Sequence, residues 1–385
     1  MNLATWFSSR TKFVKYARRV SSECGKGMLA QFLELAILRF SRNQVGAQEY
    51  YEFEAFDDKK YSLREKRQFV GWRMEGEYAG RLNARAWDVV TTDKLVAYAI
   101  FRGLGLPYPR ILAVYQPYGR TFPGAITIRE ENELARYLRD GIDFPFFSKP
   151  AHGSSGRNSV ACVAYDAVSD ELVLANGEKA GVDDYVARCY PRRGVFPWEA
   201  GFIFQELVRP APECERAFGT MVPGMRLVVL NRDAKPQLFR AILKIPTGKS
   251  MTDNFGAVGE RGTIVAELDR QSGVIVRAQQ GIAPDMVCLE YHPITGHRLL
   301  GFQIPNWERC LSLLDCAVRA FPGVRLQHWD IAVSDVGPVI FEMNTSGGFG
   351  LPQIATRRGF CDDEFVGFID ELGGRYPQYR ASDEH

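Results

Sequence analysis

The chain has 385 residues, which allows two or three compact units with substantial cores. Its 46% hydrophobic and 12% aromatic content is that of an ordinary globular protein, and this excludes a disordered or fibrous chain. The formal net charge is only +2, so the overall charge calls for neither nucleic acid nor an anionic membrane, and we expect no nucleic-acid partner.

Eight cysteines are scattered through the sequence without a Cys-x-x-Cys pair, which favours reduced thiols over a zinc or disulfide framework. The most apolar early run, residues 28–40, carries Glu34 and Arg39 and is too short to span a bilayer. No signal peptide is expected, because the early basic residues precede no adequate apolar core. We therefore expect a cytoplasmic location and no transmembrane segment.

Residues 1–88 are predicted to be helical and rather polar. One broad apolar helix face is expected from Leu29, Phe32, Leu33, Leu35, Ile37 and Leu38. A basic cluster precedes this face, and a solvated helix surface is its favoured interpretation. Contact with a membrane or a partner is the alternative.

A capped helix is predicted after Thr92 or Asp93, ending near residues 103–105. A strand over 110–115 follows. A charged helix over 127–140 is then expected, because a Thr-x-x-Glu capping signal opens it.

Short strands dominate from residue 144 onward, which is an α+β pattern. We predict strands over 144–149, 160–165, 171–175, 202–208, 225–230, 237–245, 263–268, 274–278, 326–333 and 338–343, and helices over 183–190 and 307–321.

Glu342 and Asn344 stand two residues apart at the end of an apolar strand, so they share one face. Asp330 lies on the preceding strand, and the turn at 334–338 predicts an antiparallel hairpin that brings all three together. Their oxygens suit Mg²⁺, which usually shares its ligands with nucleotide phosphates. A strand end with two polar caps is the alternative.

Lys149 ends a predicted strand and is followed by His152 and a Gly153-Ser154-Ser155-Gly156 loop. The backbone amides of such a loop can cradle phosphate oxygens, and the lysine offers a point charge. An ordinary hairpin is the alternative for the loop alone.

The strand over 202–208 turns into a polar segment that ends at Glu213. This segment suits an interdomain hinge whose backbone holds an adenine edge while Glu213 accepts from a ribose hydroxyl. Without other observations, a sheet strand with a capped exit is the favoured interpretation.

The order of these motifs resembles the ATP-grasp superfamily, and most closely its sugar-transfer-associated branch; D-alanine–D-alanine ligases and glutamate ligases are more distant. The resemblance covers roughly residues 45–355. It rests on Lys94, Lys149 with its Gly-Ser loop, Gln205 to Val208 with Glu213, and Asp330 with Glu342-Met343-Asn344.

The resemblance implies an α+β ATP-grasp fold, in which two subdomains grip ATP, preceded by an N-terminal helical region. It implies that Lys94, Lys149 and the loop Gly153, Ser154, Ser155 and Gly156 bind phosphates. It implies that Gln205, Glu206, Leu207 and Val208 line the adenine site and Glu213 binds the ribose. Asp330, Glu342 and Asn344 would hold Mg²⁺, with Mn²⁺ as an alternative.

Catalytic roles are assigned to Arg226, Lys244, Asn254 and His328. Arg226 and Lys244 are charges within apolar strands, and they either contact a transferring phosphoryl group or form strand salt bridges. Asn254 is a phosphate contact by resemblance. His328 stands where D-alanine–D-alanine ligases carry an arginine; it either assists deprotonation of an amine or is a packed histidine, and His152 is similarly ambiguous.

The resemblance favours an ATP-dependent carboxylate–amine ligase that works through an acyl phosphate. A kinase or a nucleotide-binding regulator is the alternative. The expected partners are small-molecule carboxylates and amines of amino-acid or sugar-acid type, and a homodimer stays open. The expected organisation is a helical region (1–88), a linker segment (89–140), a small subdomain (141–208), a C-terminal subdomain (209–375) and a tail (376–385).

Overall fold

The computed structural model describes residues 3–152, 158–189, 201–232, 235–247 and 262–373, with side chains from Phe13 onward. The predicted segments Gly153 to Gly156 and Asn254, and the predicted tail, lie outside these residues. None of the described helices is long and apolar enough to cross a membrane.

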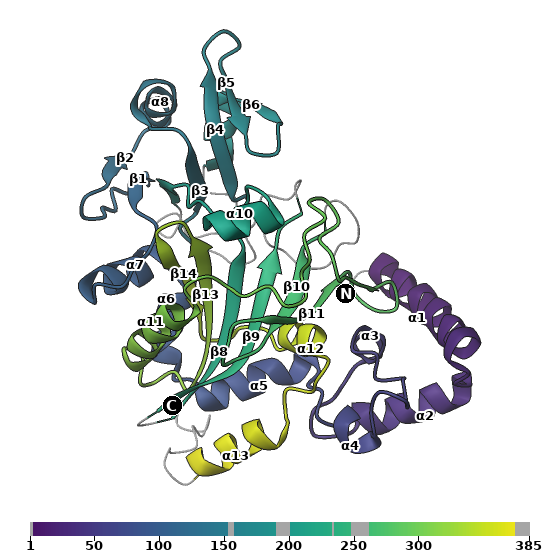
Figure 1. The fold of residues 1–385 in the computed structure, drawn as a ribbon. Helices are drawn as coiled ribbons and strands as arrows, with labels where there is room; N and C mark the ends of the chain where they lie inside the picture. Colours follow the sequence, from purple (N-terminus) through teal and green to yellow (C-terminus); the bar gives the residue numbers. More distant parts are fainter. Residues whose placement is uncertain (1–2, 153–157, 190–200, 233–234, 248–261, 374–385) are drawn as a thin grey trace.

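Two seven-stranded sheets dominate the structure (Figure 1). The first has the order β2-β1-β7-β3-β4-β5-β6. Its strands are β1 (Ile111–Tyr115), β2 (Ile126–Ile128), β3 (Phe146–Pro150), β4 (Val160–Asp166), β5 (Glu171–Leu174), β6 (Lys179–Gly181) and β7 (Phe202–Glu206). The β1–β2 pair is parallel and the other neighbours are antiparallel.

The second sheet has the order β12-β11-β10-β9-β8-β13-β14, and its neighbours are antiparallel. Its strands are β8 (Gly224–Asn231), β9 (Pro236–Ile245), β10 (Ile264–Leu268), β11 (Ile275–Gln280), β12 (Val287–Cys288), β13 (Leu326–Ser334) and β14 (Gly337–Asn344). Apart from β12, which was not predicted, these strands lie close to the predicted ones, because apolar runs bounded by Gly and Pro specify them well.

Helices precede the first strand, as predicted for the N-terminal part. They are α1 (Leu3–Cys24), α2 (Met28–Arg39), α3 (Ala47–Glu52), α4 (Leu63–Lys66), α5 (Trp72–Leu82), the 3-10 turn Arg85–Trp87, α6 (Asp88–Thr92) and α7 (Lys94–Gly103). The later helices are α8 (Glu131–Arg136), continued by a π turn at Tyr137–Gly141, α9 (Val182–Cys189), α10 (Pro212–Phe218), α11 (Trp307–Arg319), α12 (Gly350–Thr356) and α13 (Asp363–Leu372).

The prediction of one helix over 127–140 is wrong at its start. Thr127 lies in β2, where it pairs with Val114 of β1. The α8 helix begins after Glu130, whose side chain forms a capping box with Glu133. A β-branched run beside an available strand edge pairs as a strand, and the cap moves to the next suitable residue.

The two sheets meet through α7 and through the segment that leaves β7. Pro210 bridges to Ser334 at the end of β13, and the backbone of Ala211 donates to the carbonyl of Val333 at 3.0 Å. The largest core cluster contains residues from α7, both sheets and α11, such as Tyr98, Ile203 and Trp329. The chain after β7 therefore links the first sheet to the β13–β14 hairpin.

The hairpin turn between β13 and β14 is the one that the sequence predicted. Gly337 has a φ of 112°, which a residue with a Cβ rarely adopts. The hydroxyl of Ser334 donates to the carbonyl of Gly337 at 2.5 Å. This turn sets the register up to the Ile331–Ile340 pair, and an irregularity of the ladder between Ile331 and Asp330 then brings Asp330 opposite Glu342.

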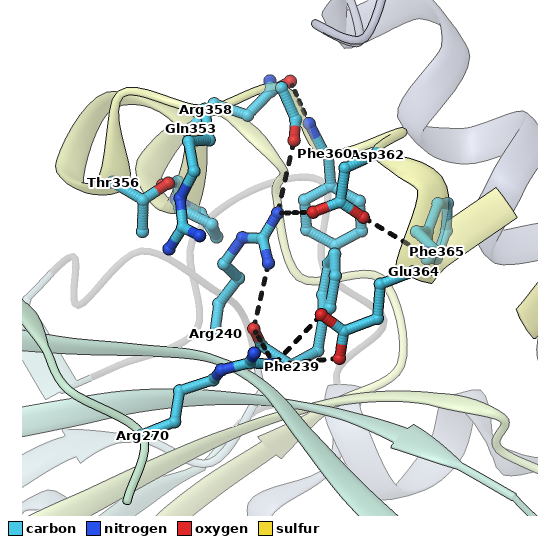
Figure 2. A network of polar contacts seen from close by, with 12 residues as sticks. Phe239, Arg240, Arg270, Gln353, Thr356, Arg358, Phe360, Asp362, Glu364 and Phe365 are labelled. Carbon is cyan, nitrogen blue, oxygen red and sulfur yellow. Dashed lines mark hydrogen bonds and ion pairs between the residues drawn. The ribbon is translucent and has the colours of Figure 1, made fainter. Parts of the chain in front are cut away.

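The other face of the second sheet is covered by α5, α12 and α13, and a buried arginine anchors this C-terminal segment (Figure 2). Arg240 of β9 donates to the carboxylate of Asp362 at 2.6 Å and to the carbonyl of Gly359 at 3.3 Å. Arg270 pairs with Glu364 at 2.9 Å beside it. These contacts hold the chain between α12 and α13 against the sheet.

Candidate functional site

Asp330 is the centre of a buried polar cluster on the second sheet. Its register partners are Arg226 on β8 and Glu342 on β14. Arg226 donates to both carboxylate oxygens at 2.8 Å each, and Nζ of Lys244 donates to one of them at 3.0 Å. The sequence left open whether these two cations form strand salt bridges or face a cleft. In the structure both are paired with the predicted metal ligand.

The charge balance keeps Asp330 ionised. Burial alone would raise the pKa of this carboxyl, but Arg226 and Lys244 outweigh burial and hold the pKa below its ordinary value. The amide nitrogen of Asn344 also donates to Asp330, at 3.3 Å. The three predicted oxygen ligands therefore share one end of the β13–β14 hairpin.

Glu342 is approached from a different element. Nζ of Lys94, the first residue of α7, lies 3.5 Å from a carboxylate oxygen of Glu342. The carboxylate of Asp93 caps α7 by accepting from the backbone amides of Leu95 and Val96 at 3.0 and 3.2 Å. The predicted cap is confirmed, and it places the lysine at the hairpin.

Lys149 of β3 contributes a side chain of the first sheet to the cluster at the β13–β14 hairpin. Nζ of Lys149 donates to the hydroxyl of Tyr98 at 2.7 Å, and this hydroxyl donates to the carbonyl of Phe341 at 3.1 Å. Burial lowers the pKa of Lys149, which Glu342 and Asp330 partly counteract. Burial also lowers the pKa of Lys94. Four cationic side chains thus converge on two carboxylates, and such an excess of buried positive charge favours a polyanion.

The oxygen ligands fit a hard cation that is completed by phosphates. No group of three or more His, Cys, Asp and Glu side chains within the described residues could hold a metal by itself. Two carboxylates and one amide oxygen are too few for a closed protein cage. They suit Mg²⁺, which keeps sites for water and phosphate oxygens.

One link between α7 and the predicted phosphate loop was missed by the sequence reasoning. Asp93 accepts from Arg120 at 2.6 Å and lies 3.1 Å from Nε2 of His152. The backbone amide of Lys94 donates to the carbonyl of Ala151 at 3.1 Å. The start of the helix that carries one lysine is thereby fixed to the strand exit that carries the other.

The predicted adenine segment follows the end of β7. Gln205 is buried, and its Oε1 has no partner among the described residues. Glu206 links β7 to the residue before β1, because its carboxylate accepts from the backbone amide of Arg110 at 2.8 Å. Leu207 and Val208 are half-buried just beyond the strand.

Glu213 is not in a loop, as the sequence suggested, but in the first turn of α10, where it is exposed. Pro212 before it starts this helix, because proline suits the first helical position. No contact connects the carboxylate of Glu213 to the cluster around Asp330 in the described part of the chain, so its role stays a prediction.

His328 lies on the face of Asp330 but packs beside a pair of aromatic rings, Phe349 and Phe360, which stack on each other with centroids 3.9 Å apart. Its ring lies 6.2 Å from Phe349 and 6.3 Å from Phe360, with nearly parallel planes. Neither ring nitrogen has a partner within the described residues. Burial, helped by the charge of Arg226, lowers the pKa of His328 to about 3. This environment favours the packed histidine over the proton acceptor, although the catalytic prediction stays untested.

Gly347 leaves the space that His328 occupies. A Cβ at this glycine would lie 2.3 Å from Cγ of the imidazole. Gly347 therefore makes room for the histidine ring.

The family comparison agrees with this geometry. Residues 73–364 match the family described as sugar-transfer associated ATP-grasp. A search of curated proteins found no match.

Solved structures give distant likenesses. The ATP-grasp ligase PsnB complexed with a minimal precursor is 17% identical, with 80% of this chain and 70% of that chain covered and a TM-score of 0.38. D-Alanine–D-alanine ligase from Helicobacter pylori is 10% identical, with coverages of 80% and 70% and a TM-score of 0.42. L-Amino acid ligase from Bacillus licheniformis is 11% identical, with a TM-score of 0.38; 69% of this chain is covered, but the match spans only 45% of that ligase.

Proposed function

Because the chain belongs to the sugar-transfer-associated ATP-grasp family, we propose that this ATP-grasp enzyme is a carboxylate–amine ligase that forms an amide bond through an acyl phosphate. The observation that carries the proposal is the convergence of Lys94, Lys149, Arg226 and Lys244 on Asp330 and Glu342. This arrangement supplies positive charge for a triphosphate and oxygen ligands for its metal ion.

The lysines are proposed to bind the nucleotide phosphates. Lys149 comes from the first sheet and Lys94 from α7. Both side chains are proposed to contact a bound triphosphate. Both pKa values are lowered by burial, and a bound phosphate oxygen would favour the charged form of each lysine. The orphan Oε1 of Gln205 is proposed to accept from the adenine amino group.

Asp330, Glu342 and Asn344 are proposed to hold Mg²⁺, or Mn²⁺ in its place. When bound, this ion would neutralise negative charge on the phosphate oxygens. Arg226 and Lys244 would then turn part of their hydrogen bonding from Asp330 to the transferring phosphoryl group. Their position beside the metal ligand supports this exchange of partners.

The proposed reaction has two steps. A carboxylate oxygen of the first substrate attacks the γ-phosphorus of ATP, and ADP leaves with the electron pair of the broken phosphoanhydride bond. The amine of the second substrate then attacks the carbonyl carbon and loses a proton, and inorganic phosphate leaves. Charge stabilisation and positioning suffice for this chemistry, which needs no side-chain nucleophile.

The substrates are proposed to be small molecules of amino-acid or sugar-acid type, and the cytoplasm, where ATP is supplied, is the proposed location. The test is a phosphate-release screen of carboxylates crossed with amines, with ATP and Mg²⁺ present. A ligase releases inorganic phosphate only when both substrates are present. ADP formation with a phosphorylated acceptor and no free phosphate would assign a kinase instead.

A further inference from the structure

The α2 helix is apolar on both of its faces. Leu38 and Leu35 turn inward and pack with Val20 of α1 and Tyr51 of α3. Leu29, Leu33 and Ile37 recur at intervals of four residues on the opposite side, Phe32 lies three residues after Leu29, and all are exposed. A helix that is apolar all round is normally covered on all sides.

The exposed side is large and continuous. We call it the α2 outer face, and it consists of Met28, Leu29, Phe32, Leu33, Ile37 and Phe40. The exposed fractions reach 72% for Leu29, 60% for Phe32 and 90% for Phe40. Single exposed apolar residues are common in soluble proteins, but six on one helix mark an interaction surface.

The charged groups around this face are mainly cations without a carboxylate partner. Arg39 in the last turn of α2 and Arg42 just after this helix form no ion pair among the described residues, and Lys15 and Arg18 are exposed on α1, which contacts α2. The nearby carboxylates are paired with other cations, since Glu34 pairs with Lys26 at 2.6 Å and Glu23 with Arg19 at 3.0 Å, and Arg19 also pairs with Asp285 at 2.6 Å. The rim is therefore positive, although the whole chain is nearly neutral.

We propose that the α2 outer face docks on an anionic lipid surface, with its apolar side chains at the acyl boundary and its cations at the headgroups. An apolar helix face flanked by Lys and Arg is the pattern of interfacial helices. A second copy fits less well, because a two-fold contact would bring one basic rim against another. The proposal does not depend on which reaction the enzyme catalyses.

The position of the helix allows such docking. Figure 1 shows α1 and α2 at the periphery, beside α3 and α4 and far from the first sheet. The cluster around Asp330 lies elsewhere, on the second sheet at the β13–β14 hairpin. The enzyme could thus work while it is held at a membrane surface, close to lipid-linked or membrane-delivered substrates.

The test is co-sedimentation of the full chain with vesicles. One set contains only phosphatidylcholine, and in the other a third of the lipid is phosphatidylserine. Binding to the anionic set should be at least about tenfold stronger, because each basic residue near the surface adds attraction. The double variant Leu29→Ser/Phe32→Ser should lower this binding by about tenfold or more through lost apolar burial.

Ile294→Ser is the matched control, since Ile294 is an exposed apolar residue of another region (58%) and its change should leave binding unaltered. All changed side chains are exposed, so thermal unfolding and ATP binding should match the wild type. Absence of binding to anionic vesicles, equal binding to neutral ones, or binding that survives the double change overturns the proposal. A dimer in light scattering that the double change converts to a monomer, without vesicle binding, assigns the face to a second copy.

Discussion

Arg226 and Asp330 form a bidentate ion pair across the neighbouring strands β8 and β13, with both hydrogen bonds at 2.8 Å. The pair is largely buried, and Lys244 joins it from β9. A cross-strand pair at this depth ties the proposed metal ligand to the proposed phosphoryl contact. The ion pair therefore contributes both to the stability of the second sheet and to the geometry of the proposed site.

Asp330→Asn should damage both stability and turnover. The change leaves Arg226 and Lys244 buried without their counterion, which typically costs about 3–5 kcal/mol of unfolding free energy. Urea denaturation measures this cost, and turnover should be undetectable even in the folded fraction. Asp335→Asn, in the β13–β14 turn, is the control. A variant with wild-type stability and activity would remove Asp330 from the site.

Glu342→Ala should separate function from folding. The side chain of Glu342 is 34% exposed and its contact with Lys94 is 3.5 Å, so we expect a stability change below about 1 kcal/mol. Loss of a metal ligand should reduce turnover by about two orders of magnitude or more. A magnesium titration of turnover, with thermal unfolding alongside, checks both parts. Full activity at ordinary Mg²⁺ would contradict the metal assignment.

Lys149→Met should weaken ATP binding while keeping the apolar stem that packs beside Tyr98. Loss of one charge-assisted contact to phosphate corresponds to about 1.5–3 kcal/mol, or roughly ten- to a hundredfold in Kd. Calorimetry with a non-hydrolysable ATP analogue gives the value. Lys179→Met, an exposed lysine of β6, is the matched control. Equal affinity of both variants would place Lys149 outside the nucleotide site.

As the pH rises, ATP affinity should begin to fall at a lower pH than the ordinary lysine pKa would predict. Burial lowers the pKa of both Lys94 and Lys149 in the free protein, and only their charged forms attract phosphate. Affinity is therefore full at pH values below the lowered pKa and is lost as the pH rises through it. Bound phosphate raises the pKa again, so binding in this window should take up protons.

Calorimetry in two buffers of different ionisation enthalpy measures that uptake. The Lys149→Met variant should show less of it, since one of the two groups is gone. An affinity that stays constant up to the ordinary lysine pKa of 10.5 would contradict this account.

His328→Phe should retain turnover within about threefold, because a neutral ring can still pack beside the stacked pair of Phe349 and Phe360. Burial holds the pKa of His328 near 3, so the imidazole is neutral in both steps of the proposed reaction. The pH profile of kcat should not change. A loss of about two orders of magnitude at unchanged thermal stability would instead give His328 a catalytic role.

The strands and the caps follow from local sequence. The apolar runs of β13 and β14, the turn between them at 334–338 and the cap of α7 at Thr92 or Asp93 were all predicted from the sequence. The local rules gave wrong predictions at two residues. Thr127 pairs with β1 as part of β2, and Glu213 lies in the first turn of α10, which begins at Pro212. At Thr127 a tertiary neighbour outweighed a capping signal, whereas at Glu213 the local helix start at Pro212 was overlooked.

The sequence by itself determined that Glu342 and Asn344 share a strand face, because the period of a strand is two, and that a hairpin could bring Asp330 to them. Only the tertiary structure decided that Lys149 from the other sheet reaches the same point, and that Arg226 and Lys244 pair with Asp330. It also decided that the second apolar face of α2 faces solvent. Local periodicity states which side chains lie together on one element, whereas packing between elements decides what each face meets.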